Sequence, residues 1–157
     1  EVDPLFAPRT PGRRAIEVYP HAAIVGLFDL PFILRYKAKR RRTRPYRSAE
    51  LRCLLDLLES LTAFDPPLDV RSSPRWPEIR AAVAEPASGA ALSRVEDEID
   101  AYVCAYVALA WWRRDGVRCR AFGDRAGGAI VTPVTPHHAA RLDALLAATS
   151  SAPSDVG

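Results

Sequence analysis

The longest hydrophobic pattern in the chain lies between residues 93 and 116, and it predicts a helix. It begins with Ser93 followed three residues later by Glu96, the signature of a capping box at a helix start. Gly116 comes after two arginines and provides a stop. The interior reads AYVCAYVALAWW and is apolar nearly all the way round. We therefore expect this helix to be covered on two sides and to organise the rest of the fold.

Two aspartates stand at the head of this hydrophobic stretch. On a wheel of about 100° per residue, Asp100 shares a stripe with Cys104, Val107 and Trp111, and Asp97 lies about 60° to one side. A carboxylate that faces the core is costly to desolvate unless something pairs with it. Two interpretations follow: a structural ion pair with an arginine, or a cation site at the mouth of a cleft.

A short strand is predicted over residues 15–19, and Pro20 ends it. Ile16 and Val18 would face one way, and Glu17 the other. In a central strand of a mostly parallel sheet both faces are apolar, so Glu17 would be a polar exception that calls for a function. In an edge strand it would simply be solvated.

The remaining elements follow from shorter patterns. Leucines at helical spacing predict an amphipathic helix from Ser48, its expected N-cap, to Leu61. The alternating sequence VRCRAF, the turn GDRAGG and the run AIVTPV predict a β-hairpin over residues 117–134. Three shorter helices are expected over residues 21–28, 76–83 and 138–149.

Composition describes an ordinary globular chain of 157 residues with 48% hydrophobic and 26% charged residues. The three cysteines form no CxxC pair, which predicts reduced thiols and a cytoplasmic location. No secretory signal is visible, and the longest apolar run is too short for a membrane span. The chain starts with Glu rather than Met, which leaves open processing or an origin within a longer protein.

The net charge of +3 conceals a basic segment, residues 35–47, that has no acidic side chain. Such a run is typically solvated and mobile, but with its two tyrosines it would also suit a surface that follows a phosphate backbone and stacks bases. The arginines of this segment are weaker evidence for nucleic-acid binding because the whole chain is rich in arginine. The candidate nucleic-acid-binding residues are Arg35, Lys37, Lys39, Arg40, Arg41, Arg42, Arg44 and Arg47.

The sequence contains no GxxxxGK[ST] loop, GxGxxG turn, GxSxG elbow or HExxH pair, which removes support for those enzyme classes. The remaining candidate functional groups are carboxylates. The candidate catalytic residues are Glu17, Asp97 and Asp100, and the candidate metal ligands are Glu17 and Asp100. Hard oxygen donors favour Mg²⁺ or Mn²⁺, which activate water for phosphodiester hydrolysis. The pair His137–His138 is a weaker metal candidate, because adjacent side chains on a regular element point apart.

Four motifs in this order, AIEVYPHAA, RYKAKRR, EDEIDAYVCAYVA and GGAIVTPV, resemble a prokaryotic family of predicted nucleases with an RNase H-like fold of the resolvase and integrase type. The resemblance covers roughly residues 14–134. It implies that Glu17 matches the acidic residue of the fold's fourth strand, and that Asp100, with Asp97 beside it, matches the acid of the last helix. Lys37 and Lys39 match basic positions that follow the E-V-Y-P strand.

The resemblance also implies a first strand with an aspartate in a G-[IV]-D setting, and two further strands after it. The chain has no counterpart, since Asp3 stands in EVDPLF and too close to Glu17. We therefore expect an α/β, helix-rich RNase H-like fold with a small sheet that lacks its first strands. The uncovered apolar face would then favour a complementing N-terminal segment or a homo-oligomer. A fragment, a split protein and a decayed remnant all fit.

The expected organisation is an extended lead-in (1–13), the RNase H-like portion (14–134), a short terminal helix (135–148) and a disordered tail (149–157). The expected function is a metal-dependent nuclease, inactive if the missing aspartate is essential. Two alternatives remain: a non-catalytic nucleic-acid-binding module that uses the basic segment, and an α-rich protein-interaction domain.

Overall fold

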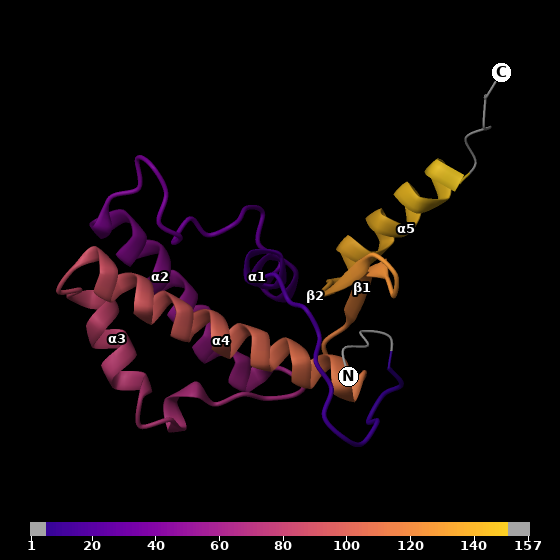
Figure 1. Cartoon of the computed structure of the whole chain (residues 1–157), viewed down its shortest axis with the longest axis horizontal. Coiled ribbons are helices and arrows are strands. Elements are labelled where there is room, and N and C mark those ends of the chain that lie inside the picture. Colours follow the sequence, from indigo (N-terminus) through magenta and orange to yellow (C-terminus); the bar gives the residue numbers. More distant parts are fainter. Residues whose placement is uncertain (1–5, 151–157) are drawn as a thin grey trace.

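The computed structural model describes the backbone of residues 6–150 and shows a helix-rich α/β fold with a two-stranded antiparallel sheet. Figure 1 shows α4 running through the middle of the molecule, with α2 and α3 beside its N-terminal part and α1 and the hairpin toward its C-terminal end. The elements, in chain order, are α1 (Pro20–Phe28), α2 (Arg44–Glu59), η1 (Ser60–Ala63), η2 (Val70–Ser72), α3 (Trp76–Ala84), α4 (Gly89–Arg113), β1 (Cys119–Asp124), β2 (Gly128–Pro133) and α5 (Pro136–Ser150).

Helix α4 is the predicted organising element, and it contacts α1, α2, α3 and both strands. Its start differs from the prediction: it begins at Gly89, and the Ser88 side chain accepts a hydrogen bond from the Ala91 N–H. The Ser93–Glu96 pair is therefore not a capping box. Glu96 is instead buried on the face that meets α2 and the basic segment, because it has tertiary partners there.

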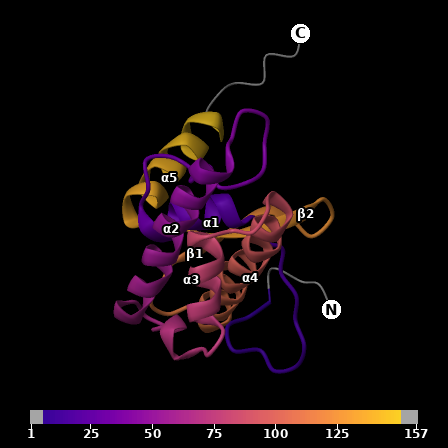
Figure 2. The same ribbon diagram turned by 90° about the vertical axis from the view of Figure 1, so that its left-hand side faces the viewer.

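The hydrophobic core is formed by α4 with α1, α2 and α3, and it includes one residue of β2. Figure 2 shows the backbone of these elements from a second direction. The leucines of α2 recur at helical spacing and bury one side of that helix completely. Helix α2 starts earlier than expected, with Thr43 as its N-cap. The Ser48 hydroxyl is buried and donates to the Val83 carbonyl of α3, so it joins two helices and does not cap one.

The predicted hairpin is confirmed as β1 and β2, which pair from Cys119–Pro133 to Asp124–Gly128. The predicted strand at residues 15–19 is reduced to a parallel bridge between Glu17 and Ile130, in which the Glu17 carbonyl accepts from the Val131 N–H at 2.9 Å. Burial alternates as predicted, with Ile16 half-buried and Glu17 exposed.

Two glycines allow close backbone contacts that hold the ends of α4 and β2. A Cβ at Gly26 of α1 would lie 1.8 Å from the Pro133 carbonyl oxygen, so α1 packs directly on the end of β2. Gly116, with φ of +72°, follows α4 and would place a Cβ 1.9 Å from the Asp65 carbonyl oxygen. No larger residue fits at either position without moving the backbone.

Residues 6–13 form no helix or strand and pack on the C-terminal end of α4, where Arg114 donates to the Phe6 carbonyl at 2.7 Å. At the C-terminal end of the described chain, α5 includes the residues of the predicted terminal helix and extends away from the rest of the molecule (Figure 1). The expected tail lies almost entirely outside the described residues. Within residues 6–150, no helix is both long and apolar enough to cross a bilayer.

Candidate functional site

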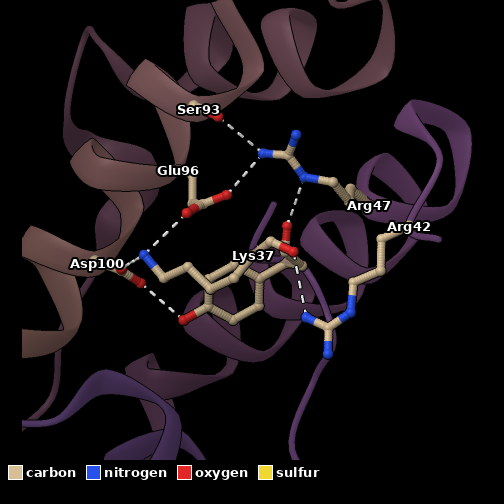
Figure 3. Close-up of polar contacts among 7 residues, drawn as sticks. Lys37, Arg42, Arg47, Ser93, Glu96 and Asp100 are labelled. Carbon is tan, nitrogen blue, oxygen red and sulfur yellow. Dashed lines mark hydrogen bonds and ion pairs between the residues drawn. The ribbon is translucent and has the colours of Figure 1, made fainter. Parts of the chain in front are cut away.

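Three α4 side chains, Ser93, Glu96 and Asp100, face the basic segment and form the base of a polar cluster. Their spacing of three and four residues places them on one side of the helix. Figure 3 shows them opposite Lys37 and Arg47, which come from the segment before α2 and from α2 itself. We call these residues, together with Tyr36, the α4 cluster.

Glu96 is the centre of the α4 cluster. One of its carboxylate oxygens lies 2.9 Å from the Lys37 ammonium and the other 2.8 Å from the Arg47 guanidinium. The side chains of Glu96 and Arg47 are each 6% exposed. A buried carboxylate is tolerated only when it is paired, so the two cations are what allows Glu96 to stay in this position.

Arg47 fixes the basic segment to α4 through three partners. Besides Glu96, its guanidinium donates to the Tyr36 carbonyl at 2.8 Å and to the Ser93 hydroxyl at 3.0 Å. Arg42 adds a hydrogen bond of 3.2 Å to the Lys37 carbonyl (Figure 3). The planar guanidinium suits such a site because its donors have fixed directions. The basic segment is therefore anchored at both of its ends.

Asp100 lies at the edge of the α4 cluster, with its side chain 14% exposed. One oxygen accepts from the Tyr36 hydroxyl at 2.8 Å and the other from the Lys37 ammonium. Burial and the Asp100 carboxylate raise the pKa of Tyr36, which stays a hydrogen-bond donor. Burial lowers the pKa of Lys37, but its hydrogen bonds to Asp100 and Glu96 outweigh this, and the pKa is raised overall.

His21, in the first turn of α1, completes the surroundings of Asp100. Its ring stacks on Tyr36 with centroids 4.8 Å apart and an interplanar angle of 4°. Burial lowers the pKa of His21; Asp100 opposes this shift, while Lys37 and other nearby cations add to it. The imidazole is therefore held in its neutral form beside the charged cluster.

The other predicted acids lie apart from the α4 cluster. Asp97 is exposed. Glu17 is also exposed, and it lines a cavity of about 590 Å³ together with Cys104, Ala108 and Trp112 of α4. Cys104 follows Asp100 by one helical turn, and its pKa is raised by burial and by Asp100. The described residues do not bring Glu17, Asp97 and Asp100 together as one close group of three ligands.

The basic segment divides into anchored and exposed residues. Arg47 is buried, and Lys37 and Arg42 are half-buried with internal partners. Between them the chain makes a turn in which Arg41 has a left-handed φ of +70°. Tyr36 is fully buried, whereas Tyr46 is 41% exposed. The exposed basic side chains of the segment are Arg35, Lys39, Arg40, Arg41 and Arg44.

Sequence reasoning missed Glu96 and His21 as members of this site. Glu96 was assigned to a cap, although its spacing of four from Asp100 places both on one face of the helix. His21 lies in the first turn of an apolar helix, and no local sequence signal connected it with Asp100. Arg47 was expected on the surface, and only its distant partners on α4 reveal its role as an anchor.

One further group of possible metal ligands lies elsewhere. Asp29, at the end of α1, and His137 and His138, at the start of α5, bring one ligand atom each to within 4.8 Å of one another. Among residues 6–150, this is the one group of at least three His, Cys, Asp or Glu side chains whose ligand atoms lie close enough together to share an ion.

No curated protein and no solved structure matches this chain. A family profile does match, over residues 1–126, which cover the whole α4 cluster and end in the hairpin turn. The match spans most of the chain's 157 residues. The chain therefore belongs to the family described as Protein of unknown function (DUF429).

Proposed function

We propose that this protein binds the phosphate backbone of nucleic acid through its basic segment and supplies two carboxylates, Glu17 and Asp100, to a metal-dependent nuclease site of RNase H-like type. The observation that carries the proposal is the anchoring of the segment: Lys37 links it directly to Asp100. The exposed cations are therefore held next to the acid that would ligate the metal.

The exposed part of the segment has the chemistry of a backbone-binding surface. Lys39, Arg40, Arg41 and Arg44 are exposed, and no ion pair neutralises any of them within the described residues. The anchors on either side hold this turn in place, which lowers the entropic cost of binding. Tyr46 adds an exposed ring on which a base would stack. Such a surface attracts a polyanion by charge and does not read its sequence.

In this proposal Glu17 and Asp100 share one hard divalent cation, and their chemistry supports this. Glu17 offers an exposed carboxylate, and each Asp100 oxygen keeps a second lone pair beside its one donor. Glu17 and Asp100 would hold Mg²⁺ or Mn²⁺, which activates water and stabilises a leaving oxygen when bound. Tyr36 and Lys37 orient the Asp100 carboxylate, and Lys37 adds positive charge for a phosphate. Asp97, exposed one turn earlier, is an auxiliary carboxylate in this proposal.

Backbone binding is tested with a fluorescent single-stranded oligonucleotide and the double variant Arg40→Gln/Arg44→Gln. We expect affinity to fall steeply with salt, and the magnitude of the slope of log K against log[salt] to decrease by about 1.4 in the variant, the effect of losing two phosphate contacts on a single strand. Arg118→Gln/Arg141→Gln removes the same charge from exposed positions at the hairpin and α5 and serves as the control. Equal losses in the two double variants would contradict a specific role for the basic segment.

Hydrolysis is tested by incubating labelled single-stranded and duplex DNA and RNA with the protein in Mg²⁺ or Mn²⁺. We expect cleavage that Glu17→Gln or Asp100→Asn reduces by at least a hundredfold, as for loss of a ligand that stabilises the transition state. Glu96→Gln is the matched control, because it disturbs the same cluster and is no metal ligand here. A chain that cleaves equally well without Glu17 and Asp100 would rule out this site.

A second candidate function, nucleic-acid binding without catalysis, is favoured by the hydrogen bonds that Asp100 already makes. Lys37 and Tyr36 already satisfy both of its oxygens, as Lys37 and Arg47 satisfy Glu96. In that case affinity for the oligonucleotide would not depend on Mg²⁺ and would still decrease in Arg40→Gln/Arg44→Gln. An α-rich protein-interaction domain remains the outcome if the chain retains no nucleic acid at low salt.

A further inference from the structure

Two helices meet near the C-terminal part of the described chain with three metal-binding side chains between them. Asp29 follows α1 in a left-handed conformation with φ of +52°. Thr135 and the first turn of α5 lie opposite, and the Thr135 hydroxyl is 3.3 Å from an Asp29 oxygen. His137 and His138 belong to that first turn. The two histidines lie beyond the residues matched by the family profile.

The geometry of these side chains is close to that of a bound ion's ligands. The His138 Nε2 lies 3.6 Å from an Asp29 carboxylate oxygen. Two donors that share one zinc ion at ordinary zinc–ligand distances are about 3.4 Å apart. The imidazole rings of His137 and His138 have centroids 5.8 Å apart, so the adjacent histidines do not point away from each other. The expected obstacle to a shared metal is therefore absent at this helix start.

The ligand types select the class of metal. Two imidazoles and one carboxylate suit zinc and its neighbours Ni²⁺ and Cu²⁺, whereas Mg²⁺ prefers oxygen donors alone. Asp29 and His137 are exposed and His138 is half-buried, so an ion reaches the site from solvent. Three protein ligands leave a fourth position for water.

We propose that Asp29, His137 and His138 bind a divalent transition-metal ion of the zinc class and that this ion clamps α5 onto α1. His138 also lines an apolar cavity of about 500 Å³ between α1, β2 and α5, together with Gly26, Leu142 and Leu145. Because His138 lines this cavity, a metal bound to it fixes the position of α5 and therefore the width of the cavity. The site is independent of the nuclease proposal.

The experiment is a titration of the untagged chain with Zn²⁺ alone, monitored by competition with a chromogenic chelator. We expect one equivalent to bind, with affinity at least tenfold lower in Asp29→Asn and in His137→Ala, and lost in His137→Ala/His138→Ala. Because the chain has three histidines, their NMR signals provide a second readout: those of His137 and His138 should shift with Zn²⁺, and that of His21 should not.

Two controls separate this site from adventitious binding. Cys53 is an exposed thiol that could bind zinc, so Cys53→Ser must retain the full affinity. Tryptic cleavage after the exposed Arg141 of α5 should slow with Zn²⁺ in the wild type and not in His137→Ala/His138→Ala. The proposal is overturned if Zn²⁺ does not bind, if Cys53→Ser removes the binding, or if the double histidine variant binds as the wild type does.

Discussion

The basic segment, residues 35–47, contains two regions of opposite character. Lys37 and Arg47 point inward and pair with acids of α4, and Arg47 is as deeply buried as the Glu96 carboxylate that it binds. Lys39, Arg40 and Arg44 are exposed to solvent. We call Lys37 and Arg47 the inward region and these three exposed residues the outward region. Side chains of one charge, a few residues apart, thus have different surroundings: some are paired inside the fold and others are solvated. A run of positive charge in the sequence therefore does not by itself indicate a uniformly solvated surface.

The two regions differ in how their charges are stabilised. An inward cation has lost its hydration and needs a fixed partner. Removing the cation therefore leaves a buried carboxylate without its counter-charge in an apolar environment. An outward cation keeps its water and contributes little to folding. Substitutions in the inward region should therefore change stability strongly, and substitutions in the outward region should change it little.

The largest effect is expected for Arg47→Met. It removes the hydrogen bonds to Tyr36, Ser93 and Glu96 while it keeps the volume of the side chain. We expect a loss of about 3 to 5 kcal/mol in the free energy of unfolding, measured by urea denaturation, since one partner of a buried ion pair is left behind. Arg52→Met, at an exposed position of the same helix, should change it by less than about 0.5 kcal/mol.

Replacing both partners sharpens this test. In Arg47→Met/Glu96→Gln the buried acid disappears together with its cation, so part of the lost stability should return. If the loss in the double variant equals or exceeds the sum of the losses in the two single variants, Arg47 and Glu96 do not stabilise each other, and the description of the inward region must change.

A smaller loss, about 1 to 2 kcal/mol, is expected for Lys37→Met, because Glu96 keeps Arg47 and Asp100 keeps the Tyr36 hydroxyl. The pKa of Lys37 is raised, so the stability that its charge provides is fully present below the ordinary value of 10.5 and is lost as pH rises through the folded value. The difference in unfolding free energy between wild type and variant should therefore be constant from about pH 7 to 9. A difference that shrinks within this range would contradict the ion pairs with Lys37.

Much of the fold was predictable because its signals are local. The hairpin of residues 117–134 and the helix from Trp76 combine turn residues with short-period patterns, and both are confirmed. The leucine spacing of α2 also identified its buried face correctly. Each of these elements is encoded by neighbouring residues, so one sequence is enough to find it.

The site was less predictable because its partners are distant in sequence. Tyr36 is 64 residues from Asp100, and Arg47 is 49 residues from Glu96. Ser48 and Ser93 looked like caps, but both side chains have tertiary partners. A local cap signal and a tertiary contact use the same residue types, and only the fold decides between them.

A substitution of His21 tests whether an additional positive charge beside the inward region lowers the stability of the fold. Its pKa is lowered by burial, so the unfolded state binds more protons as pH falls below the ordinary value of 6.5. Its neutral form therefore favours folding fully above that value, and the contribution is lost as pH falls through the folded pKa. We expect the unfolding free energy of His21→Phe to decrease less than that of wild type between pH 7.5 and pH 5. His138→Gln provides the comparison, and an identical pH dependence in His21→Phe would contradict the burial of a neutral imidazole.

The smallest effect, and one of opposite sign, is expected for Arg44→Gln in the outward region. Arg44 is the first residue of α2, whose first turn has no acidic side chain, so its positive charge lies at the positive end of the helix dipole. Removing the charge should stabilise the fold by about 0.3 to 1 kcal/mol at low ionic strength, and the gain should fade as salt is added. Lys39→Gln removes the same charge outside any helix and should leave stability unchanged. If Arg44→Gln stabilises the protein and weakens oligonucleotide binding, then Arg44 reduces stability and supports binding, which separates the outward region from the inward one; a destabilised Arg44→Gln would place it with the anchors.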